Sequence, residues 1–223
     1  MKRKDIAQGL NQIADKELST RTAIHEAGHA AAIYLGNKKK HLPPVFFQII
    51  IKDVGKQVQS LAKPTNRANS VARVDGGRLI HTLPSSTAEA THHFYPAQKQ
   101  AYERAFEADI INLLVGPLAE AMYVAKRDDE LINPHLVNLA ALHYYGGSSD
   151  LAVVSEYLEC LRANREQREK KIAELFLAAY NFVSIRSHWR AITGLANYIL
   201  SSRKPIIECE EAIAVLDNAL GKR

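Results

Sequence analysis

The chain of 223 residues is long enough to bury a sizeable core, and we expect a single domain over residues 1–223. Hydrophobic residues make up 47% and charged residues 24% of the chain, as in ordinary soluble globular proteins, and the formal net charge is only +5. The main basic run, Lys38-Lys39-Lys40, is expected to be a solvated loop. Because no basic stripe interleaved with aromatic residues occurs, we expect no nucleic-acid partner.

The cysteine content and the apolar runs bear on the compartment of the protein. Cys160 and Cys209 are far apart, so they predict neither a disulfide framework nor a metal knuckle and favour a reducing, cytoplasmic location. The basic and then amphipathic start, MKRKDIAQGLNQIADKELS, predicts an N-terminal extension over residues 1–18 and no signal peptide. The longest apolar run, IINLLVGPLAEAMYVA, is short and contains Asn112 and Glu120, so we expect no membrane span.

The stretch RTAIHEAGHAAAIYLG, residues 21–36, predicts the first helix. Ser19 or Thr20 can cap its start, its alanine-rich interior has high helix propensity, and Gly36 suits the position just past its end.

Three titratable side chains lie in the middle of this apolar helix. His25 and His29 are one turn apart on the same face, where two neutral imidazoles can bind one metal ion. Glu26 lies one step around the helix and can act as general base on a water at the metal, as in the H-E-x-x-H motif of zinc peptidases. Gly28 leaves room for another chain segment to approach. The alternative is that these polar groups are satisfied by neighbours in the core, since each costs about 1–3 kcal/mol if buried without a partner.

The region after the first helix predicts a small sheet. Residues Val45–Val54, VFFQIIIKDV, are rich in β-branched and aromatic side chains and predict a strand. A short strand around Val71–Val74 and another at Arg78–Leu83 are expected to follow. Residues 19–96 would therefore hold the first helix and this sheet.

Beyond Pro96 the pattern is typical of helices, so we expect residues 97–223 to be helical and the whole chain to be mainly α (α+β). The expected helices are Ala97–Ala125, Pro134–Tyr145, Ser148 to about Ala163, two longer helices up to about Ser202, and Glu208–Leu220 after Pro205. A break in the first of these at Gly116-Pro117 is left open, because proline cannot continue a helix without a kink.

A catalytic zinc site needs a third protein ligand. The metzincin pattern is excluded, because its required glycine and histidine are replaced by Ala32 and Leu35. Asp150 in YYGGSSDLAVV is a candidate: two glycines allow a tight turn, Ser148 or Ser149 can cap the next helix, and the helix dipole favours an ionised aspartate in its first turn. An aspartate there can also serve as a cap alone. The other candidates left open are Glu120, His81, His92, His93 and His143.

Four segments occur in an order that resembles a known protease domain. HEAGHAAAIYLG, IINLLVGPLAEAMYV, GGSSDLAVVSEYL and SHWRAITGLANYILSSRKPIIECEEAIAVLD are similar to the protease domain of the FtsH family, the ATP-dependent AAA-type zinc metalloproteases. That family carries HEAGHA, a segment like LLGGRAAEELVFG, and TGASNDLxxAT. The resemblance spans about Thr22 to Leu220. VGPLAEA departs from GGRAAEE, with Ala121 in place of the second acidic residue, and YGGSSD departs from TGASND.

The resemblance implies a role for each matching residue. His25, His29 and Asp150 match the zinc ligands, Glu26 matches the catalytic glutamate, and Glu120 matches a glutamate that we expect to orient a ligating histidine. Zn²⁺ is the implied cofactor.

The phosphate-loop pattern G-x-x-x-x-G-K-S/T does not occur in the sequence. We therefore expect a zinc endopeptidase that cuts short or unfolded polypeptides without ATP when alone. The alternatives are a protease that needs a separate ATPase partner and a zinc-containing binding or regulatory module without turnover. A homo-oligomer is left open. The strand at Val45–Val54 or the strand at Arg78–Leu83 is expected to pair its edge with an extended substrate.

Overall fold

The computed structural model describes residues 19–51, 72–133 and 137–221. Predictions for residues 1–18, 52–71 and 134–136 lie outside the described residues. The elements after the first helical turns are η1 (Ala32–Gly36), α2 (Asn37–Lys39), β1 (Phe47–Ile51), β2 (Ala72–Gly76), α3 (Thr87–Ala90), α4 (Pro96–Arg127), η3 (Leu139–Tyr145), α5 (Ser148–Leu161), α6 (Arg165–Ser184), α7 (Arg186–Ser201), β3 (Ile206–Ile207) and α8 (Cys209–Ala219). The predicted mainly helical architecture with a small sheet is confirmed.

The helix that carries HEAGH, which we call the motif helix, spans residues 19–39 and includes the π-helical segment η1. Two predictions about its ends are wrong. Ser19 and Thr20 are already helical, and Gly36 does not end the helix, because its backbone is right-handed and the chain continues into α2. The helix ends instead in a Schellman motif: His41 has a φ of 54°, and the amide of Leu42 donates to the Asn37 carbonyl at 3.0 Å.

The lysine run lies at this helix end and not in a loop. Lys38 and Lys39 belong to α2, and Lys40 follows it. All three are exposed, so the expectation that they are solvated is confirmed.

The three strands form an antiparallel sheet in the order β2-β1-β3. Ile49 in β1 lies opposite Val74 in β2 and Ile207 in β3, and the side chains of Ile49 and Ile207 are fully buried. β1 and β2 confirm two of the predicted strands. β3 was not predicted, because two residues after a proline give too short a pattern to detect.

The predicted strand at Arg78–Leu83 is wrong. This segment is irregular, and its amides bond to a side chain instead of a neighbouring strand. Leu79 and Ile80 donate their amides to the two oxygens of Asp109 in α4, each at 2.9 Å. The hydroxyl of Tyr157 in α5 donates to the Ile80 carbonyl at 3.1 Å.

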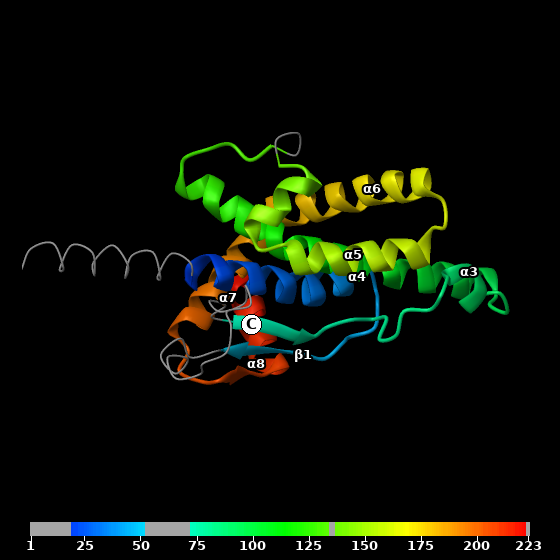
Figure 1. The fold of residues 1–223 in the computed structure, drawn as a ribbon. Helices are drawn as coiled ribbons and strands as arrows, with labels where there is room; N and C mark the ends of the chain where they lie inside the picture. Colours follow the sequence, from blue (N-terminus) through cyan, green and yellow to red (C-terminus); the bar gives the residue numbers. More distant parts are fainter. Residues whose placement is uncertain (1–18, 52–71, 134–136, 222–223) are drawn as a thin grey trace, which may run out of the picture.

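The motif helix lies between two layers (Figure 1): α4, α5 and α6 pack on one side, and the sheet lies on the other. α4 is the central helix and continues through Pro117, so the break left open at Gly116-Pro117 does not occur. A proline inside a helix removes one hydrogen bond, but most of the second half of α4 is buried, and that packing keeps the helix continuous.

Within the described residues, α4 has the length and apolar composition to cross a membrane, and 83% of its apolar window is buried inside the protein. The helix is thus longer than the apolar run that we judged too short. The central core helix of a soluble protein has the same profile, so the absence of a membrane span stays a prediction.

The chain between α4 and α5 sets the position of Asp150. η3 is a 3₁₀ helix, shorter than the helix predicted for Pro134–Tyr145, and it ends at Gly146 with a φ of 71°. Gly147 precedes α5 and Ser148 is its first residue, so the predicted serine cap is wrong. Asp150 does lie in the first turn of α5, as predicted. α3, in the region 84–96, was not predicted.

Candidate metal centre

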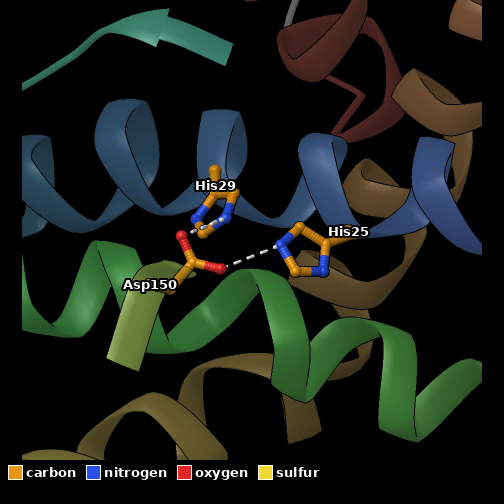
Figure 2. A group of neighbouring side chains, drawn as sticks. All are labelled: His25, His29 and Asp150. Carbon is orange, nitrogen blue, oxygen red and sulfur yellow. Dashed lines mark hydrogen bonds and ion pairs between the residues drawn. The ribbon is translucent and has the colours of Figure 1, made fainter. Parts of the chain in front are cut away.

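His25, His29 and Asp150 converge on one point. One ligand atom from each lies within 4.8 Å of the other two, so the group could bind a metal ion. Figure 2 shows both histidines projecting from the motif helix toward Asp150, which comes from the start of α5. His25 Nε2 lies 3.2 Å from Asp150 Oδ2, and His29 Nε2 lies 3.5 Å from Asp150 Oδ1. The i, i+4 spacing predicted the pair, and the glycine turn before α5 brings the third group to it.

The other nitrogen of each imidazole is fixed by a different partner. His29 Nδ1 lies 2.8 Å from the carbonyl oxygen of Asn112, and His25 Nδ1 lies 3.1 Å from Glu120 Oε2. A carbonyl can only accept, so His29 Nδ1 must carry the proton. When the Nε2 of His29 carries no proton, its lone pair faces the Asp150 carboxylate.

Two acceptors that face each other at 3.5 Å inside a protein need positive charge between them or near them. A metal ion supplies it, and so does a proton on an imidazole. Imidazole nitrogens and a carboxylate oxygen are also ligands that divalent transition metals prefer. The residues present therefore fit a metal ion on both geometry and chemistry.

The charged groups of the site shift one another's pKa values. Burial disfavours the charged form of His25, but hydrogen bonds to Asp150 and Glu120 outweigh burial and hold the pKa of this imidazole well above its usual value. Burial acts to raise the pKa of Asp150, but His29 and His25 outweigh it and lower that pKa. Burial likewise opposes ionisation of Glu120, while His25 and Arg21 lower its pKa.

Two glycines allow the motif helix to approach α4. A Cβ on Gly28 would lie 2.9 Å from the Ala119 side chain, and a Cβ on Gly116 would overlap the His29 ring. The expectation that Gly28 leaves room for another segment is confirmed. Gly116 was missed, because its role depends on how α4 packs and not on a local pattern.

Glu120 is a buried neighbour of His25 and not a member of the ligand group. It contacts Nδ1 of His25, whereas Asp150 contacts Nε2, so the two carboxylates lie at opposite nitrogens of one ring. Arg21 donates to the other oxygen of Glu120 and was missed by the sequence reasoning. The histidines left open as ligands are exposed and lie outside the group: His81, His92, His93 and His143.

Glu26 faces the sheet side of the motif helix. Its Oε2 accepts a hydrogen bond of 2.6 Å from the amide of Val74 in β2, and the residue is half-buried. It lies outside the ligand group, although its charge acts on His25.

The open edge of the sheet beside the site belongs to β2. β1 is the central strand and the segment 78–83 is no strand, so the prediction that one of those two would present the edge is wrong. Because the Val74 amide donates to Glu26, the backbone groups of this residue face away from β1. A pocket of about 620 Å³, lined in part by Phe46, Arg73 and Val74, adjoins this edge.

Comparisons with protein-family models, curated proteins and solved structures found no match. The chemistry of the site therefore stands on its own residues.

Proposed function

We propose that the protein is a zinc-dependent endopeptidase that hydrolyses short or unfolded polypeptides, and that it needs no ATP when it acts alone. The observation that carries the proposal is the ligand group of His25, His29 and Asp150, in which both Nε2 atoms face one carboxylate. The resemblance of the HEAGH, AEA and SSD segments to FtsH-family proteases supports the same assignment. In this proposal the protein is cytoplasmic.

The proposal assigns a separate task to each residue. His25, His29 and Asp150 would hold the zinc ion, which when bound polarises a carbonyl and makes a water more acidic. Glu26 would take a proton from the attacking water and pass it to the leaving amine. The amide of Val74 occupies one oxygen of Glu26 and orients this carboxylate, so the second oxygen is available for the proton.

An extended substrate would lie along β2. The amide of Val74 is bonded to Glu26, so its carbonyl is the group at the open edge that could accept a main-chain hydrogen bond from an added peptide strand. The adjoining pocket has room for a side chain of that peptide. This arrangement favours unfolded chains, because a folded substrate uses its own amides internally.

One observation is the basis for a second function. The carboxylate of Glu26 is bonded to the Val74 amide, so the same residues are also compatible with a metal-containing binding or regulatory module that does not turn over substrate. A peptidase that depends on a separate ATPase partner is the other alternative.

Glu26→Gln separates these functions. We expect the variant to keep about one zinc per chain and to lose cleavage of casein, because the ligands remain and the base is gone. Glu169→Gln, which changes an exposed glutamate on α6, is the matched control and should cut casein like the unsubstituted protein. Zinc content is measured by elemental analysis and cleavage by gel electrophoresis.

The same assay tests the preference for unfolded substrates and the independence from ATP. Casein should be cut equally with and without ATP–Mg²⁺, while a stable folded protein survives, since unfolding costs about 5–15 kcal/mol. Zinc binding without cleavage of either substrate would favour the module or a missing partner. Cleavage by Glu26→Gln would assign the base to another group, and a protein that binds no zinc would refute the proposal.

A further inference from the structure

We propose that Arg21 is a positioning residue for the metal centre: it fixes Glu120 and the loop before Asp150, and through them the orientation of His25. The inference rests on the proposed zinc site and goes beyond it, because Arg21 touches neither the ligand group nor the substrate edge. Three sets of contacts carry it.

The first set joins Arg21 to Glu120. Arg21 Nε and Nη2 lie 2.9 Å and 2.7 Å from Glu120 Oε1. Both donors use the same oxygen, so Oε2 remains for His25 Nδ1 at 3.1 Å. Arg21 precedes His25 by four residues, so both side chains leave the same face of the motif helix and reach the same carboxylate.

The second set joins Arg21 to the chain that leads to the third ligand. Arg21 Nη2 donates to the carbonyl of Tyr144, the second-last residue of η3, at 3.2 Å. The turn at Gly146 follows, and then α5 with Asp150. One guanidinium therefore connects the helix that carries both histidines with the segment that delivers the aspartate.

The third observation is how closely Gly146 covers the Glu120–His25 contact. A Cβ at Gly146 would lie 3.0 Å from Glu120 Oε2 and 3.2 Å from His25 Nδ1. The backbone thus lies directly over this hydrogen bond, and the left-handed φ of 71° together with the lack of room for a Cβ favours glycine. Without Arg21, Glu120 would lose a charged partner in a site where it is 6% exposed, and the orientation of its carboxylate toward His25 would no longer be fixed.

A guanidinium suits this task better than an ammonium group. Its planar fork presents several donors in fixed directions, so it can contact Glu120 and the Tyr144 carbonyl at once. The side chain of Arg21 is partly exposed, at 29%, and methionine in its place keeps the aliphatic stem that packs against the protein. Its loss should therefore act on the metal centre more than on folding.

The test compares three variants of the full chain with the unsubstituted protein. Arg21→Met should weaken zinc affinity about tenfold, the lower end of the range for residues that orient a ligand. Arg21→Lys should recover part of this loss. Arg165→Met removes a guanidinium from an exposed ion pair with Glu169 and should bind zinc normally. Zinc affinity is measured by competition with a chromophoric chelator.

A second readout separates positioning from a general structural role. The absorption spectrum of the cobalt(II)-substituted protein should change in Arg21→Met, because the orientation of His25 changes, and should be close to normal in Arg21→Lys and Arg165→Met. Thermal unfolding checks that all variants fold.

Unchanged affinity and spectrum in Arg21→Met would overturn the inference and leave the proposed function standing. An equal loss in Arg165→Met would overturn it as well, because the effect would not be local. If the unsubstituted chain binds no zinc, the proposed function fails, and the inference fails with it.

Discussion

α4 carries two buried carboxylates, and their surroundings differ in kind. Asp109 is 2% exposed and Glu120, about three helical turns later, is 6% exposed. Asp109 accepts from neutral donors, namely the amides of Leu79 and Ile80 and the hydroxyl of Tyr157. Glu120 contacts two groups that can carry positive charge, Arg21 and His25.

The pKa values of these carboxyl groups move in opposite directions for this reason. Burial raises the pKa of Asp109, and its neutral donors together with the positive charge of Arg78 offset burial only in part. Burial also opposes the charge of Glu120, but His25 and Arg21 outweigh it and lower its pKa. Neutral donors are sufficient to fasten a chain segment to a helix. Arg21 and His25, by contrast, contact Glu120 directly and favour its ionised form.

The largest expected effect lies at the metal centre, where Glu120 of α4 and Asp150 of α5 both contact His25. Asp150→Ala should weaken zinc binding by more than a hundredfold, since removing one ligand costs roughly 3 kcal/mol if the total for a zinc site is divided among its ligands. Alanine at His81, His92, His93 or His143 should leave the affinity unchanged. Competition with a chelator measures it. An equal loss from one of those histidines would place the third ligand elsewhere.

A substitution at Asp109 should lower the stability of the fold and leave zinc binding unchanged. Asp109→Ala leaves the amides of Leu79 and Ile80 without their acceptor, and each costs about 1–3 kcal/mol when buried, while the Tyr157 hydroxyl keeps the Ile80 carbonyl. We expect the free energy of unfolding to fall by about 3 kcal/mol, with unchanged zinc affinity in the folded protein. Urea denaturation measures the first and chelator competition the second. A loss of zinc affinity would show that the two ends of α4 are coupled.

Glu120→Ala should give the opposite pattern to Asp109→Ala. Zinc affinity should fall about 10–100-fold, because His25 loses the partner that orients it. The effect should remain smaller than that of Asp150→Ala, which removes a ligand. If both substitutions cost the same and a glutamate oxygen is found bound to the metal, Glu120 is the third ligand.

The sequence predicted the parts of this site that a single helix defines. His25, Glu26 and His29 follow from one periodic segment, because helix geometry fixes their relative positions. Asp150 is 125 residues beyond His25; its place at a predicted helix start made it the more persuasive candidate, and the resemblance added support. Arg21 was missed although it is four residues before His25, because its role depends on where α4 places Glu120.

In the fold, too, features set by a local pattern were predicted and features set by tertiary contacts were not. β1 was predicted because its β-branched residues form a dense run, and α4 because its pattern is long. The segment 78–83 has strand-like composition, but Asp109 and Tyr157 take its backbone groups. Tertiary contacts of that kind leave no local trace in the sequence.

The smallest expected effect is the response to pH, and it distinguishes the two carboxylates once more. The pKa of His25 is raised in the folded protein, so this group adds stability below its ordinary pKa of 6.5, and the stability is lost as the pH rises through the raised value. Glu120, whose pKa is lowered from 4.5, adds stability above 4.5 and loses it as the pH falls. Asp109 has a raised pKa, so its ionisation costs stability as the pH rises above 3.8.

Above pH 6.5 these signs predict opposite trends for two quantities: the free energy of unfolding of the zinc-free protein falls, and the zinc affinity rises. In the presence of a strong chelator, the free energy of unfolding should fall as the pH rises, by at most about 1.4 kcal/mol per pH unit for one proton. Zinc affinity should rise over the same range, because His25 must lose its proton to become a ligand. In Glu120→Gln the fall should be weaker, since a neutral amide no longer favours the charged imidazole. Asp109→Asn should keep the full decline, because Asp109 has no contact with His25. Urea denaturation between pH 6 and 9 for the three proteins tests this, and an equally steep decline in Glu120→Gln would mean that Glu120 does not control the proton on His25.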